Sequence, residues 1–244
     1  MSGQAARADD GEQGALQTLL RTIASRDRRA ISRLLAERPQ LARMAIRTGA
    51  TRENASPWYF EEIPHYVYAG DTPLHLAAAS YQRDLAGELV SLGANVRARN
   101  RRGAEPLHYA SDGAPGSLSW NPAAQGAVVR FLIRAGADPD AEDKSGVAPL
   151  HRAVRTRSTP AVRALLSNGA DARRKNRSGS TPLHLSVQNT GRGGTGSAAS
   201  RAEQSEIIRL LLRHGARPSD RDSSGRTVGD CVKAGWIRAL FARP

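Results

Sequence analysis

Apolar residues recur along most of this chain at the spacing of short amphipathic helices, separated by polar turns. Between residues 85 and 92 three leucines follow one another at helical spacing, and Gly93 comes directly after them. Such a run predicts a helix that ends at a glycine in the left-handed conformation. A shorter apolar run begins at Thr72 and Pro73, where threonine can cap a helix and proline fits the first helical position. The segment therefore predicts two helices joined by a turn and followed by a polar finger.

The same helix pair is repeated along the chain. Four copies of Pro-Leu-His mark its first helix, with histidines 33, 43 and 33 residues apart at His75, His108, His151 and His184. A Gly-Ala pair follows the second helix of each copy, at Gly93, Gly136, Gly169 and Gly215. Two independent markers with a shared period of about 33 residues predict a repeat protein. In such a protein each helix pair is stable only when it stacks on its neighbours.

These residues resemble the ankyrin repeat family, whose unit reads Gly-x-Thr-Pro-Leu-His-x-Ala, continues with a second helix and closes on Gly-Ala-Asp. The resemblance covers roughly residues 70–235 and extends in weaker form to about residue 14. It implies an all-α solenoid of about six helix-turn-helix units with projecting hairpin fingers, and a role in holding partner macromolecules. It also implies that the marker histidines bond to the backbone of the neighbouring finger and bind no metal.

We expect one repeat domain over residues 14–244, preceded by a flexible tail of residues 1–13. The expected units cover about residues 14–69, 70–103, 104–146, 147–179, 180–225 and 226–244. The first and last units lack the Pro-Leu-His marker, as expected for caps that face water. The tail contains no apolar run that could be a signal peptide or a membrane span.

The composition agrees with a single solenoid, and the charge adds one functional ambiguity. The 244 residues are 39% hydrophobic and only 5% aromatic, as expected for helices that pack through leucine and alanine. A single cysteine, Cys231, cannot form an internal disulfide, which suits a reducing compartment, so we expect a cytoplasmic protein. The formal net charge is +13 and comes almost entirely from arginine. This excess fits an acidic partner protein, nucleic acid or a compositional bias alone.

Basic residues gather on two of the fingers, and the finger between them carries acidic residues. The candidates for partner binding on the fingers are Arg97, Arg99, Arg101, Arg102, Arg173, Arg174 and Arg177. The interrupted basic stripe favours discrete contacts with carboxylates or phosphates over continuous binding of nucleic acid. The family pattern leaves the position after the marker histidine variable, which adds Tyr109 and Arg152 to the candidates.

We therefore predict a non-enzymatic scaffold that binds another protein, an acidic one being one candidate, through its concave finger and first-helix surface. Nucleic acid is the alternative partner, and we expect no membrane partner, no cofactor and a monomer. No catalytic residue is expected, because the acidic pairs are consecutive rather than opposed. Neighbouring repeats lie ~8–10 Å apart, which is too far for their histidines to share one metal ion.

Two insertions fall at the same place in their units, between the first and the second helix. The first covers residues 111–120 and the second, which is rich in glycine, about 189–199. A second alternative function is a small-ligand or catalytic site between these loops, with the candidates Trp120, Asn121, Gln188, Asn189 and Arg192. The glycine-rich loop lacks the lysine of a Walker loop and the strand of a dinucleotide fingerprint, which favours a flexible linker. Ser200 and Glu203 after it form a capping-box pattern.

A long finger at residues 48–68 holds most of the aromatic residues of the chain. One interpretation is a small local core that packs this finger against the first two units. The other is a hot spot for a partner protein, because aromatic side chains often carry interface energy.

Overall fold

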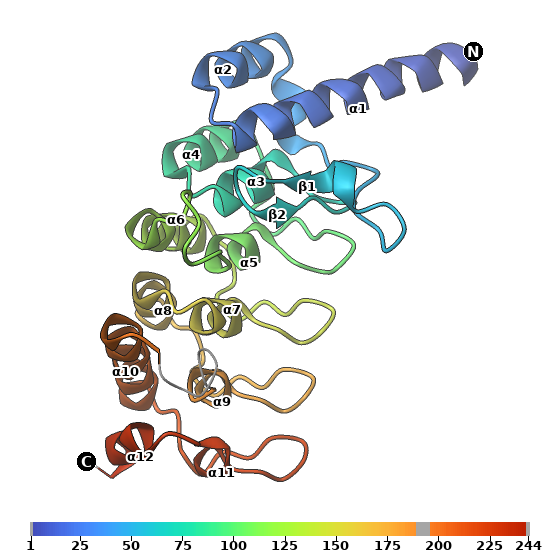
Figure 1. Ribbon diagram of the computed structural model, residues 1–244. Helices are drawn as coiled ribbons and strands as arrows, with labels where there is room; N and C mark the ends of the chain where they lie inside the picture. Colours follow the sequence, from blue (N-terminus) through green and yellow to red (C-terminus); the bar gives the residue numbers. More distant parts are fainter. Residues whose placement is uncertain (1, 189–195, 243–244) are drawn as a thin grey trace. The chain divides into compact units, whose positions relative to one another are not determined.

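The computed structural model describes residues 2–188 and 196–242, and the chain divides into two compact units (Figure 1). Unit 1 is Met1–Asp138 and unit 2 is Pro139–Pro244. Both units consist of antiparallel helix pairs joined by loops, which confirms the repeat character that the sequence predicts.

Unit 1 contains three helix pairs and one short hairpin. Its elements are α1 (Ser2–Ala24), α2 (Arg28–Glu37), the 3-10 helices η1 (Pro39–Arg43) and η2 (Ser56–Trp58), β1 (Tyr59–Phe60), β2 (His65–Tyr66), α3 (Pro73–Ala79), α4 (Arg83–Ser91), α5 (Pro106–Ser111) and α6 (Pro122–Arg134). Helices α1, α3 and α5 pack on one another in sequence, and α4 packs on α6 behind them. The core between the layers is made of leucine and alanine, including Leu16, Leu74 and Leu107, which are fully buried.

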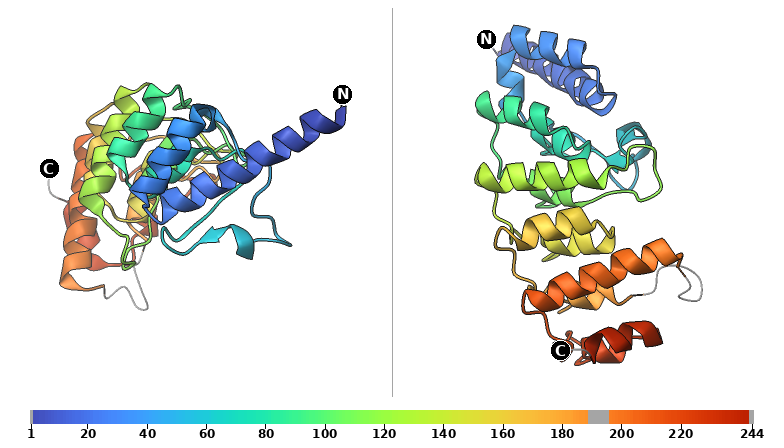
Figure 2. Two further views of the ribbon diagram at one scale, coloured as in Figure 1. Left: turned by 90° about the horizontal axis from the view of Figure 1, so that it is seen from above. Right: turned by 90° about the vertical axis from the view of Figure 1, so that its left-hand side faces the viewer.

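Unit 2 repeats this arrangement with α7 (Pro149–Arg155), α8 (Thr159–Leu166), α9 (Pro182–Ser186), α10 (Ala198–Arg213), α11 (Val228–Cys231) and α12 (Gly235–Phe241). Helix α9 packs on α7 and α11, while α10 packs on α8 and α12. In Figure 2 the longer helices α8 and α10 lie side by side in one layer of this unit.

The marker histidines join each helix start to the next loop. In α3, Nδ1 of His75 accepts a hydrogen bond from the backbone amide of Thr72 at 3.1 Å, and Nε2 lies 3.1 Å from the carbonyl oxygen of Ala104. His151 does the same with the amide of Ala148 and the carbonyl of Ser180. The hydrogen bonds that the resemblance implies are therefore confirmed for His75 and His151.

Each finger ends in a turn that an Asn or Asp side chain closes. The four turns are Asn100–Gly103, Asp143–Gly146, Asn176–Gly179 and Asp222–Gly225. In the first, Oδ1 of Asn100 accepts from the amides of Arg102 and Ala104, and the other three turns have the same pair of bonds. The amide of Ser223 donates to the carbonyl of Ser178, so successive turns in unit 2 are also bonded to each other.

The structure differs from the sequence prediction at three places. Residues 2–13, expected as a tail, form the first half of α1, and Figures 1 and 2 show these turns extending past the other helices of unit 1. Helix α10 begins at Ala198 with Ser197 as its cap, three residues before the predicted cap at Ser200. The long finger contains a two-stranded antiparallel sheet, which an all-α prediction does not include.

Candidate functional site

The helix position after each marker histidine is less accessible than the sequence suggests. Tyr109 is only 2% exposed, and the side chain of Arg152 is 12% exposed. Leu76 is fully buried and Leu185 is half-buried. Tyr109 and Arg152 therefore offer little surface to a partner in this structure, and their role in partner binding stays a prediction.

Tyr109 is buried because it belongs to a polar network inside unit 1. Its hydroxyl donates to Oδ2 of Asp71 at 2.8 Å and accepts from Nδ2 of Asn100 at 2.8 Å. Asn100 also donates to Oδ1 of Asp71 at 2.8 Å. The rings of His65 and His75 lie 4.3 Å and 5.0 Å from the tyrosine ring. Since buried polar groups need such partners, the tyrosine stabilises the fold.

The long finger covers this part of unit 1. Its strands pair Tyr59 with Tyr66 and Phe60 with His65. Phe60 is buried on one face of the hairpin, whereas Tyr59 and Tyr66 are 37% and 40% exposed. The burial of Phe60 agrees with the interpretation of a small local core, while the partner hot spot stays a prediction for the exposed rings of Tyr59 and Tyr66.

The predicted basic residues of unit 1 contact neighbouring side chains or carbonyls. Arg97 lies 3.6 Å from Asp138, and Arg99 donates to the carbonyl of Gly103 at 3.2 Å. Arg101 and Arg102 lie over the ring of Tyr68, 5.4 Å and 5.0 Å from its centroid. These contacts hold the four guanidinium groups against unit 1.

Three of the predicted basic residues of unit 2 form ion pairs with carboxylates of the loops. Arg173 pairs with Asp220 at 2.6 Å and Arg174 with Glu142 at 2.8 Å, while Arg152 pairs with Asp143 at 2.9 Å. Burial alone would raise the pKa of Asp143, but hydrogen bonds from Arg152 and two backbone amides outweigh it and lower the pKa. The pKa of Asp220 is likewise lowered, because the hydrogen bond from Arg173 helps to outweigh its burial.

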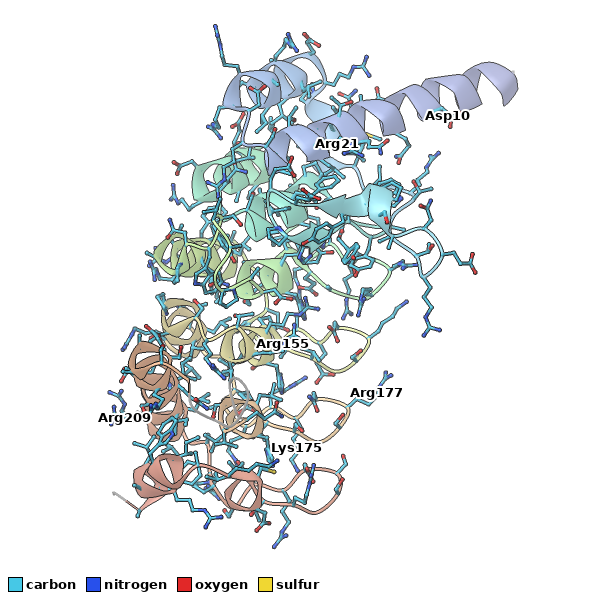
Figure 3. All side chains as sticks on the ribbon, in the orientation of Figure 1. Asp10, Arg21, Arg155, Lys175, Arg177 and Arg209 are labelled. Carbon is cyan, nitrogen blue, oxygen red and sulfur yellow. The ribbon has the colours of Figure 1, made fainter. Side chains whose placement is uncertain are left out.

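Arg177 and Lys175 differ from these paired residues. Both are exposed on the finger of unit 2 that ends in the turn Asn176–Gly179, and Figure 3 shows Arg177 at its outer end. Within residues 2–188 and 196–242, neither side chain has a hydrogen bond or an ion pair. Their positive charges are therefore not offset by a carboxylate in contact.

The basic excess is concentrated in unit 2. Unit 2, which begins after Asp138, contains 19 of the 36 basic residues and nine of the 23 acidic ones, so its formal net charge is +10. Unit 1 contains the rest and carries +3. Attraction to acidic groups should therefore act mainly on unit 2.

The edge-loop candidates have structural roles where the structure describes them. Trp120 packs against Tyr81 with the ring centroids 6.2 Å apart, and Oδ1 of Asn121 caps α6 by accepting from the amide of Ala124. The carbonyl of Gln188 accepts from Gln204 at 3.2 Å. Asn189 and Arg192 lie outside the described residues, so the edge-loop site stays a prediction.

The described residues contain no group of three or more His, Cys, Asp or Glu side chains placed to hold a metal ion. None of the helices in the described part of the chain combines the length and the apolar character that a bilayer span requires.

Comparison with known families agrees with this geometry. A family model described as ankyrin repeats in three copies matches residues 121–222, and a model of a single ankyrin repeat matches residues 69–101. Together the two matches cover just over half of the chain. None of the curated proteins that were compared with the chain matches it.

Proposed function

This chain belongs to the ankyrin repeat family, and we propose that it is a non-enzymatic scaffold that binds an acidic partner protein through the fingers of unit 2. Ankyrin repeats are generally protein-protein interaction modules, and members of the family are typically non-enzymatic. The count of six repeats, the monomeric state and the cytoplasmic location are part of this proposal.

The observation that carries the proposal is the pair of exposed cations on one finger, Lys175 and Arg177, which have no carboxylate partner among the described residues. Next to them Arg173 and Arg174 are held in place by Asp220 and Glu142. A partner carboxylate that approaches this finger can form charge-assisted hydrogen bonds with the two unpaired cations.

Nucleic acid is the second candidate, and the net charge of +10 on unit 2 favours it. Continuous binding of a phosphate backbone needs many free cations. In unit 2, however, Arg152, Arg173 and Arg174 already pair with carboxylates of the same chain. An acidic protein surface, which requires fewer and more discrete contacts, fits this arrangement better.

The test is affinity capture from a lysate of the cells that produce the protein, followed by mass spectrometry. We compare the unchanged chain with Arg177→Glu and with Arg209→Glu, which makes the same charge change on exposed Arg209 of α10, away from the fingers (Figure 3). The finger variant should recover the acidic partner at least about fivefold less well, while the α10 variant should recover it fully. Equal recovery by all three chains, or equal loss in both variants, argues against the finger surface.

A further inference from the structure

A cavity of about 450 Å³ lies in unit 1 between α1 and the hairpin of the long finger. Helix α1 contributes Thr18, Arg21 and Thr22 to its lining, Ser25 follows the end of this helix, and the hairpin contributes Tyr59, Glu61 and Glu62. This volume is within the range of pockets that take a small ligand or a single large side chain. The finger surface proposed above belongs to unit 2, so this cavity is a separate feature.

The two carboxylates of the cavity are notable in a chain with a net charge of +13. Glu61 and Glu62 are adjacent and exposed, and within the described residues neither has a hydrogen bond or an ion pair. Their only cationic neighbour in the lining is Arg21, which donates to the carbonyl of Pro57 at 3.3 Å. The lining therefore has a net negative charge and attracts a cation.

Some of the aromatic rings next to the cavity already contact a guanidinium group of the same chain. Arg21 lies 5.2 Å from the centroid of the Phe60 ring, and Tyr68 is covered by two arginines of the same chain. Tyr59 and Tyr66 belong to the same group of rings, with centroids 4.8 Å apart, and both are exposed. No cation lies over either ring in the part of the chain that the structure describes. Two rings of this group are thus occupied by guanidinium groups and two are open.

We propose that the cavity and the open face of the hairpin bind an arginine-bearing segment of a partner protein. The guanidinium group of the partner would lie on the ring of Tyr59 and donate to the carboxylates of Glu61 and Glu62. Arginine is favoured over lysine because a planar guanidinium both stacks on an aromatic ring and donates two parallel hydrogen bonds to a carboxylate. Unit 1 therefore recognises a basic segment, which is the opposite of the charge preference proposed for unit 2.

The test uses the full chain and a fluorescent eight-residue peptide of alternating arginine and glycine, with binding followed by anisotropy. Glutamate-glycine and lysine-glycine peptides of equal length are the controls. The arginine peptide should bind, the lysine peptide should bind about two- to fivefold more weakly, and the glutamate peptide should not bind at this site. Because the net charge of the chain repels a basic peptide, binding at physiological salt requires a local site.

Variants locate the site. Replacing both carboxylates, Glu61→Gln with Glu62→Gln, should weaken binding of the arginine peptide at least about tenfold. Tyr59→Ser with Tyr66→Ser should weaken it about two- to fivefold. All four side chains are exposed, so folding should be unaffected, which circular dichroism checks. Glu53→Gln, an exposed change on the same finger but outside the cavity lining, should leave affinity unchanged.

Equal loss in Glu53→Gln and in the double carboxylate variant would overturn the proposal, as would tight binding of the glutamate peptide to the same residues. The Arg177→Glu variant of unit 2 should bind the arginine peptide normally, which separates this test from that of the finger surface. Analytical ultracentrifugation of the chain tests whether a second copy of this chain, rather than a partner protein, binds in the cavity. A dimer that dissociates in both the carboxylate double variant and Arg177→Glu would show that the occupant is another copy, and would overturn the assignment to a partner protein.

Discussion

A marker histidine joins two backbone groups that belong to different parts of the chain. One ring nitrogen accepts from the amide at the start of its own helix, and the other faces a carbonyl in the next loop, as His75 does with Thr72 and Ala104. This arrangement requires a neutral ring whose proton is on Nε2, because Nδ1 must remain an acceptor. The resemblance to the ankyrin repeat implies this role, and the Pro-Leu-His marker shows at which residues of the sequence it is expected.

The neutral ring makes stability depend on pH. Burial lowers the pKa of His75 and of His151, and this effect outweighs the nearby groups that raise it. In the unfolded chain both rings take up a proton as the pH falls through about 6.5, while in the folded chain they do so only at a lower pH. The unfolded state therefore binds more protons, and the free energy of unfolding should decrease from pH 7.5 to 5.5. Urea denaturation at the two pH values measures this difference.

The control is His151→Gln, whose side chain can also accept from one amide and donate to one carbonyl but does not titrate. Its stability should change less between the two pH values than that of the unchanged chain. Burial raises the pKa of Glu105, which acts in the opposite direction, but this contribution is common to both chains and cancels. An unfolding midpoint that rises at pH 5.5 would contradict the assignment of neutral histidines.

At the scale of elements, the fingers depend on glycine because successive turns lie against each other. Gly179 has φ +71°, and a Cβ atom added there would lie 2.4 Å from the backbone nitrogen of Ser223 in the next turn. Gly225 has nearly the same conformation, φ +77°, but nothing lies within 4 Å of the added atom. Substituting each of the two glycines therefore distinguishes two losses of stability, one from the left-handed conformation and one from crowding of the neighbouring turn.

We expect Gly179→Ala to destabilise the chain more than Gly225→Ala. The second substitution should cost about 1 kcal/mol, because it only forces alanine into a left-handed conformation. The first should cost about 1–3 kcal/mol more, because the backbone of the next turn must also move. Chemical denaturation of both variants measures the difference. Equal losses would show that contact between the turns contributes little.

For the whole molecule, the sequence predicts the structural features that recur in every repeat, but not the contacts that occur only once. The helix pairs, the turns with a closing Asn or Asp, and the marker histidines are local and periodic, so their pattern is visible along the chain. Tyr109 shows the limit, since its place in the repeat suggested an open surface. The structure instead buries it against His65, a residue of a finger more than 40 positions earlier. A long-range contact that occurs only once produces no periodic pattern in the sequence.

The distribution of charge over the whole chain also requires the structure. The sequence gives the net charge of +13, but only the division into units shows that +10 of it belongs to unit 2. The ion pairs of Arg152, Arg173 and Arg174 each neutralise one cation and one carboxylate of this unit, so its net charge stays at +10. On the finger of Arg173 and Arg174, Lys175 and Arg177 remain unpaired within the described residues, so this finger offers discrete positive positions rather than a continuous stripe.

Discrete positive positions on the fingers predict that nucleic acid binds weakly and that its binding is sensitive to salt. A fluorescent 20-nucleotide DNA should bind the full chain with Kd no tighter than about 10⁻⁶ M at physiological salt, as expected for non-specific attraction. Affinity should fall steeply with salt, and Arg177→Glu should reduce the slope of log affinity against log salt by about one or two, since one cation is lost and an anion is added. Arg209→Glu is the matched control for a charge outside the fingers. Binding tighter than about 10⁻⁸ M at the same salt would instead identify a specific nucleic-acid site, because so few free cations on the fingers cannot produce that affinity by charge alone.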